Sequence, residues 1–216
     1  MKKYLDKKII ILFLLSIIYA IFSVYVYRIT SLTIHLGMVW NLFLSIIPFI
    51  LSYLLIFTVK QKWQTISIVI AISWLLFFPN APYMITGFIH LSTIAFYTTG
   101  EFEIISWIRL VHFALGISLG IKFGMLSLYN IHQLLLKYYN TAVVYVSLLA
   151  ISLLSGYAIY VGRLLRLNSW DVLQPISLAN EMITNLNSFA IFSSLLFAFY
   201  IMFTYIIYYY FIKKEN

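Results

Sequence analysis

Long apolar runs, separated by short polar or charged segments, make up most of this chain. Six of these runs approach or reach the length of roughly 20 residues that a helix needs to cross the hydrocarbon core of a membrane. They cover residues 9–27, 40–59, 63–78, 106–128, 141–161 and 189–212. The pattern predicts an all-α fold, a polytopic transmembrane helical bundle of about six spans, and a single domain over residues 1–216.

The PNAP sequence at residues 79–82 ends the third run. Each of its two prolines lacks a backbone donor and disfavours the α conformation at the residue before it, which is Phe78 or Ala81. We therefore expect the helix to stop or bend here. The next apolar stretch, residues 83–97, is short, and we interpret it as an interfacial or re-entrant helix rather than as a further crossing.

The distribution of lysine sets the expected orientation. With six crossings and both termini in the cytoplasm, nine of the ten lysines fall on the cytoplasmic side, as the positive-inside rule requires. The tenth, Lys122, lies near that side. A further crossing at residues 83–97 would move Lys137 and both C-terminal lysines to the opposite side. In this arrangement all four arginines lie outside.

Composition supports a membrane protein, because 63% of the residues are hydrophobic and only 9% are charged, too few to cover a soluble globule. The formal charge of +8 would suggest nucleic acid binding in a soluble domain, but here the lysines cluster at the ends of apolar runs. We expect membrane lipid and no nucleic acid as a partner, and the cytoplasmic (plasma) membrane of a bacterium as the location. The absence of cysteine excludes disulfides and thiolate nucleophiles.

Gly116, Gly120 and Gly124 recur every fourth residue in the fourth predicted span. This small-xxx-small pattern allows close helix approach, so we interpret the row as a helix-packing surface. His112 lies on the same row one turn earlier, and we assign it to packing as well.

The most polar interruption of the chain follows the fifth run and contains Arg163 and Arg166. Three residues apart in a helical turn, the two guanidinium groups would share a face and could bind one phosphate or carboxylate. The alternative is that they reach lipid phosphates or pair with Asp171. The positive-inside bias disfavours arginine outside unless it is used there, which favours the binding interpretation.

The rest of this segment has both functional and structural interpretations. Asp171 is a candidate acid/base, or it positions an arginine. Asn168 is a candidate binding residue, or a turn and capping residue. Trp170 is a candidate binding residue, or an interface anchor.

The PNAP segment is the second candidate site. Asn80 offers an amide at a break in the helix, and Tyr83 follows it; the alternative is a rigid turn packed on the bundle. His90 is a candidate acid/base, although a lone histidine among apolar residues is more often structural. We expect no metal and no cofactor, because the chain contains no HExxH motif, phosphate loop or dinucleotide fingerprint.

Two stretches, FFPNAPYMITGFIHL and YVGRLLRLNSWDVL, resemble the signature stretches of a bacterial membrane protein family of uncharacterised activity, domain of unknown function 1361. The resemblance is strongest from Trp74 to Leu173. The matching positions are Pro79, Asn80, Ala81, Pro82, Tyr83, His90, Gly162, Arg163, Arg166, Asn168, Ser169, Trp170 and Asp171. The resemblance implies that these motifs matter, but it implies no reaction.

The chain departs from this family pattern at two positions. The pattern carries an acid where this chain has Gly87, and an aromatic residue where it has Leu167. An acid three residues before His90 would suit a metal site or a proton relay. Its absence weakens both mechanisms here.

Three hypotheses about function follow. The first is a binding or accessory membrane protein that recognises an anionic lipid head group or envelope precursor. The second is a membrane-embedded envelope enzyme acting on a lipid-linked substrate, with Asp171 or His90 as acid/base. The third is a small-solute transporter that uses PNAP and His112.

Overall fold

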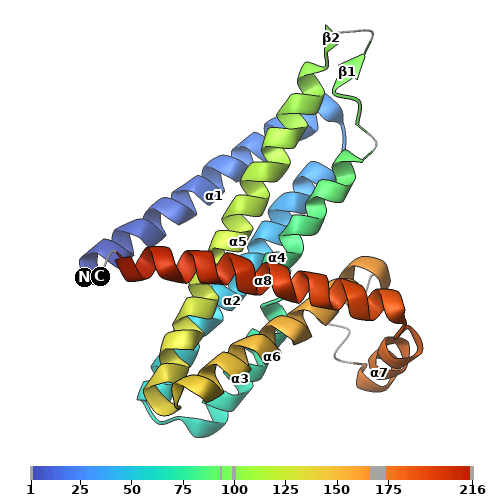
Figure 1. The fold of residues 1–216 in the computed structure, drawn as a ribbon. Coiled ribbons are helices and arrows are strands. Elements are labelled where there is room, and N and C mark those ends of the chain that lie inside the picture. The colour runs from blue at the N-terminus through green and yellow to red at the C-terminus, as the bar shows by residue number, and fades with distance from the viewer. Residues whose placement is uncertain (1, 93, 99–100, 166–173, 215–216) are drawn as a thin grey trace.

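The computed structural model describes residues 2–92, 94–98, 101–165 and 174–214, and nearly all of them are helical (Figure 1). In chain order the elements are α1 (Lys2–Thr30), α2 (Ile34–Lys60), α3 (Gln64–Phe77), α4 (Asn80–Tyr83), the 3-10 helix η1 (Met84–Leu91), β1 (Tyr97–Thr98), β2 (Glu101–Phe102), α5 (Ile104–Tyr138), α6 (Thr141–Tyr160), the π-helical turn η2 (Val161–Leu165), α7 (Pro175–Thr184) and α8 (Ser188–Lys214). The two short strands form an antiparallel hairpin in which Tyr97 pairs with Phe102.

Six helical stretches of the described chain are long and apolar enough to cross a membrane. They are Lys7–Thr30, Ile34–Lys60, Gln64–Leu91, Ile104–Tyr138, Thr141–Arg163 and Ser188–Phe211. The predicted bundle of about six spans is therefore confirmed, and the protein is a helical, multi-pass membrane protein. The observed helices extend beyond most of the predicted boundaries, because polar end residues continue a helix after its apolar run has ended.

The long helix α5 organises the bundle (Figure 1). Its first half packs against α1, α2 and η1 in an apolar cluster centred on Phe113 and Ile117. Its second half packs against α3, α6 and α8 in another cluster, which contains Met125 and Leu128. Helix α8 packs mainly along α6.

The third span differs from its prediction. Phe78 and Ala81, the residues before the prolines, both stay in helical geometry, and η1 follows α4 without a break. A short helical element does follow PNAP, as predicted: η1 begins at Met84, directly after α4. Residues 84–91 complete the span Gln64–Leu91.

Side-chain hydrogen bonds and packing explain why this span continues. The Asn80 amide donates to the Phe77 carbonyl oxygen over 2.9 Å, and the Thr86 hydroxyl donates to the Tyr83 carbonyl oxygen over 2.8 Å. These bonds satisfy carbonyl groups near the prolines. Met84 is almost completely buried in the α1/α2/α5 cluster, so the start of η1 is held inside the bundle, whereas Phe88 and Ile89 in its second half are exposed.

A buried chain of hydrogen bonds joins the second, third and fourth spans. The Trp74 indole nitrogen Nε1 donates to the Ser127 hydroxyl over 2.7 Å, and Ser127 donates to the Pro48 carbonyl oxygen over 2.8 Å. The chain therefore ties α3 to α5 and α5 to α2.

We expect Trp74→Phe to destabilise the fold by about 0.6 kcal/mol, the average for interhelical hydrogen bonds in membranes, and by about 1.7 kcal/mol at most from this bond. The substitution removes the indole N–H and keeps an aromatic ring. Thermal unfolding in detergent measures the effect. Trp40→Phe is the matched control, because Trp40 is 53% exposed, and equal shifts of the midpoint in both variants would contradict the prediction.

The predicted glycine row faces three neighbours. A Cβ atom would collide with the Tyr19 ring at Gly116, with Met84 at Gly120 and with Ala81 at Gly124. The row therefore lies against α1, η1 and α4 in turn. Direct approach to a neighbouring backbone occurs elsewhere, at Gly156 of α6, where a Cβ would lie 2.2 Å from the Ser194 carbonyl oxygen of α8.

Helix α7 is an element that the sequence reading missed. Pro175 occupies its first turn, where proline favours a helix start, and Ile176 and Ile183 lie seven residues apart on it. Both isoleucines are more than 70% exposed. The proline and this apolar spacing were the available signals.

Candidate functional site

Arg163 brings the two sequence motifs together. It lies in η2, the π-helical turn that follows α6, and such turns are frequent at functional sites. Its Nη1 donates to the Tyr83 hydroxyl and its Nη2 donates to the His90 Nε2, each over 3.4 Å. The end of the fifth span is thereby joined to the third span, about 80 residues earlier.

The contact with Arg163 fixes which ring nitrogen of His90 carries the proton. A guanidinium group only donates hydrogen bonds, so the His90 Nε2 accepts and the ring proton lies on Nδ1. The ring stacks on Phe113 with 6.0 Å between centroids and 20° between planes. His90 is half-buried. The accepting Nε2 of His90 therefore faces the guanidinium group of Arg163.

Arg109 adds a second guanidinium group to this region. It lies in the second turn of α5 and is half-buried. Its charge lies near both His90 and His35. Its Nε atom is buried and has no hydrogen-bond partner among the described residues. Arg109 therefore extends the positive charge of Arg163 into the bundle.

A buried pair of histidines continues the polar region toward α1. The His35 Nδ1 and His112 Nδ1 atoms lie 3.2 Å apart, and the His112 Nε2 lies 2.8 Å from the Ser23 hydroxyl. All three side chains are completely buried. The His35 ring also contacts Phe113, the ring on which His90 stacks. Polar groups from α1, α2 and α5 thus meet beside the arginine region.

Two positive charges and few acids give this region its chemical character. Within the described residues, the hydrogen bonds of Arg163 go to Tyr83 and His90, and Arg109 has a free buried donor. Glu101 is exposed in the hairpin. No group of three or more His, Asp or Glu side chains in this part of the chain could hold a metal ion. The arrangement suits an anion better than a cation.

Arg166, Asn168, Trp170 and Asp171 lie outside the described residues. Asn80, at the start of α4, donates to the Phe77 carbonyl oxygen at the end of α3, which is a structural role.

Gly87 contributes packing rather than chemistry. A Cβ there would lie 3.1 Å from the Met38 sulfur, so the position lets η1 approach α2 closely. A larger side chain at this position would displace Met38.

Arg109, His35 and Ser23 were missed by the sequence reading. Arg109 is the arginine that falls inside a predicted span, at residues 106–128, and an ionisable residue in such a segment is itself a sign of function. That signal was available. Nothing in the sequence pairs His35 with His112, because the contact joins helices 77 residues apart.

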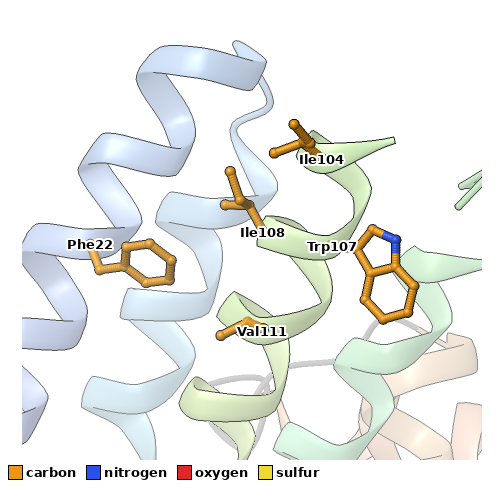
Figure 2. Close-up of a pocket in the computed structure, with 5 residues that line it drawn as sticks. All are labelled: Phe22, Ile104, Trp107, Ile108 and Val111. Atoms are coloured by element: carbon orange, nitrogen blue, oxygen red, sulfur yellow. The ribbon is translucent and has the colours of Figure 1, made fainter. Parts of the chain in front are cut away.

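An apolar pocket of about 350 Å³ lies nearby, between α1 and the start of α5. Figure 2 shows the Phe22 ring reaching from α1 toward Ile108 and Val111 of α5. The other lining residues are Ile104 and Trp107. The lining carries no ionisable side chain, so this pocket does not belong to the arginine region.

Comparison with known proteins gives a family and no activity. No curated protein and no solved structure matches the chain. One family model matches residues 40–208, a range that includes Tyr83, His90, Arg109 and Arg163, whereas Ser23 and His35 precede it. The match covers well over half of the chain, which therefore belongs to the family described as protein of unknown function (DUF1361).

Proposed function

We propose that the protein binds an anionic group, of a lipid head group or an envelope precursor, between Arg163 and Arg109. The observation that carries the proposal is the placement of two half-buried guanidinium groups around His90, with no carboxylate bonded to either one among the described residues. A cation withdrawn from water is costly unless it is paired. A bound anion supplies the pairing.

The contacts of Arg163 support exchange with a ligand. Its bonds to Tyr83 and His90 are 3.4 Å long, well beyond the usual 2.9 to 3.0 Å for N–H donors (about 0.5 Å longer). Neither partner is charged opposite to arginine. An anionic oxygen would form shorter, charge-assisted bonds in their place.

Direct titration tests this function. Purified protein in detergent should bind inorganic phosphate saturably, and added salt should weaken the binding because the attraction is electrostatic. A neutral sugar should not bind. Titrations with phosphate and sulfate that show no saturable binding of either anion would refute the proposal.

The site belongs, in this proposal, on the extracytoplasmic face of a bacterial plasma membrane. The lysine distribution supports that orientation, with both termini inside. Because the chain has no cysteine, single introduced cysteines report their own side without background. Ser92→Cys and Asn187→Cys should react with an impermeant maleimide from outside, and Gln61→Cys and Asn140→Cys only from inside. The reverse pattern would place the site in the cytoplasm.

An envelope enzyme acting on a lipid-linked substrate is the second candidate. His90 favours it, because an acid/base group lies next to the arginine that would hold the substrate. This candidate requires turnover that His90→Gln abolishes. Unchanged turnover in His90→Gln would contradict the enzyme candidate, and anion binding would then be the proposed function.

A further inference from the structure

Helix α7 separates exposed apolar side chains from exposed polar ones. Its Ile176 is 79% exposed and its Ile183 is 72% exposed. At about 100° per residue, these two isoleucines lie within about 20° of each other around the helix. The exposed polar side chains lie about 40° to 140° away in one direction, at Asn180, Thr184, Ser177 and Glu181. The two isoleucines therefore form an apolar edge of α7.

The ends of two membrane spans fix where this edge lies. The fifth span ends at Arg163 and the sixth begins at Ser188, so α7 lies in the connection between them. Its ten residues are about 15 Å long, too short to cross a hydrocarbon core of about 30 Å. Helix α7 therefore lies at one surface of the membrane, and Figure 1 shows it near the end of α8 opposite the C-terminus.

A buried contact holds the C-terminal end of α7 at this level. The Tyr160 hydroxyl donates over 3.0 Å to the carbonyl oxygen of Asn185, the residue that follows α7. Tyr160 is the last residue of α6, and it is buried in one apolar cluster with Ala190 in the first turn of α8. The end of α7 is thereby tied to both neighbouring spans, close to where they meet the membrane surface.

Exposed apolar side chains continue along the chain from α7 into α8. Leu186, Phe189 and Phe192 are each more than half exposed. Because α8 forms a membrane span, the exposed phenylalanines of its first turns face lipid. Apolar surface is unfavourable in water, in rough proportion to its area, so the isoleucines of α7 are stabilised where the same lipid covers them.

We propose that α7 lies in the plane of the membrane interface, with Ile176 and Ile183 inserted at the boundary between head groups and acyl chains. The inference concerns the contact of this helix with the bilayer and does not depend on anion binding at Arg163. Helix α7 contains no lysine or arginine and one acid, Glu181, so the attachment is apolar and not an attraction to anionic lipids.

A second copy of the chain fits this edge less well than a bilayer does. A standard protein interface buries about 800 Å² per partner, far more than two isoleucines on a ten-residue helix supply. A bilayer sets no such minimum, because it already surrounds the neighbouring spans.

Spin labels measure the depth of the apolar edge. The chain has no cysteine, so Ile176→Cys, Ile183→Cys, Ser177→Cys and Glu181→Cys can each carry one label in phosphatidylcholine bilayers. Oxygen concentrates among acyl chains, whereas a nickel chelate stays in water. Oxygen should dominate relaxation of the labels at the two isoleucine positions, which should lie about 5–10 Å into the boundary. Nickel should dominate at the serine and glutamate positions. Phe199→Cys, at a 64% exposed position in the middle of α8, gives the reference for a deep label.

A substitution on each side of the helix tests whether the isoleucines hold α7 in place. Ile183→Asn should shift the label of Ile176→Cys from oxygen toward nickel, because it removes half of the apolar edge. Thr184→Asn is the matched control, since it changes an exposed polar position one residue away, and it should leave that label unchanged. Equal shifts in the two variants, or no shift in either, would contradict the role of the isoleucines.

Three further results would overturn the inference. Nickel dominating at all four labelled positions of α7 would mean that the helix projects into water. Dipolar broadening at Ile183→Cys that disappears on dilution with unlabelled protein would mean that a second copy covers the edge. Immersion that appears only after phosphatidylglycerol is added would mean that anionic lipid, and not apolar burial, holds the helix.

Discussion

Replacing Arg163 with glutamine is expected to weaken phosphate binding by about tenfold to a hundredfold, because a charge-assisted hydrogen bond to the anion is lost. Glutamine is too short to reach Tyr83 or His90, but the bonds it loses are 3.4 Å long and therefore weak, so the local fold is largely preserved. The effect should therefore appear in the dissociation constant and not in the thermal unfolding midpoint.

Arg163→Lys should give an intermediate result. Lysine keeps the charge but loses the planar fork that bonds two acceptors at once, as Arg163 bonds Tyr83 and His90. Binding should fall less than with glutamine, and its dependence on salt should persist.

Arg28→Gln is the matched control for these variants. Arg28 lies in the last turn of α1 and is exposed, so its removal changes the net charge equally but leaves the arginine region intact. It should bind phosphate like wild type. An equal loss in Arg28→Gln and Arg163→Gln would mean that the anion follows overall charge rather than a site.

Gly156→Leu is expected to give the largest loss of stability, roughly 3 kcal/mol or more, which is the upper part of the range for overpacked cores. A Cβ at this position would lie 2.2 Å from the Ser194 carbonyl oxygen and 3.0 Å from the Ala198 nitrogen. Both are backbone atoms, which cannot turn away as a flexible side chain can. Helices α6 and α8 would have to separate.

Thermal or denaturant unfolding in detergent measures this effect, with Gly37→Ala as control. A Cβ at Gly37 meets only the end of the Ile34 side chain, at 4.0 Å. Because alanine favours a helix over glycine, Gly37→Ala should leave stability unchanged or raise it by about 0.5 to 1 kcal/mol. A Gly156→Leu protein as stable as Gly37→Ala would contradict the observed packing.

Gly156 also illustrates what a sequence reading of packing leaves out. The regular spacing of Gly116, Gly120 and Gly124 is visible in the sequence, and these glycines lie between helices. Gly156 has no glycine four residues away, although the small residue Ser152 lies there, and it faces the α8 backbone. Spacing reveals a small-residue row, but it does not identify the neighbour, because helix rotation depends on the whole bundle.

The six spans were predictable because membrane-spanning helices need long apolar runs, which a sequence displays directly. At PNAP the expected end of the regular helix is present, since α3 ends at Phe77, but α4 and η1 then extend the apolar stretch to Leu91. The proline rules describe the local backbone, whereas Asn80 and the buried Met84 supply compensation that only the three-dimensional arrangement reveals.

The candidate site was partly predictable because polar residues stand out in an apolar sequence. Arg163, His90 and Tyr83 are polar residues in apolar surroundings, and the structure brings them into contact. Arg109 and His35 required knowledge of which helix faces meet. Those contacts span tens of residues and leave no local pattern.

The length of α5 has a consequence for the depth of Arg109. At 35 residues the helix is about 52 Å long, compared with about 30 Å for the hydrocarbon core. Centred and upright in the bilayer, it projects about 11 Å at each end. Arg109 begins about 7 Å from one end of the helix, which places it among the head groups. A thicker bilayer would bring the acyl chains toward this arginine, so membrane thickness itself would tune the site.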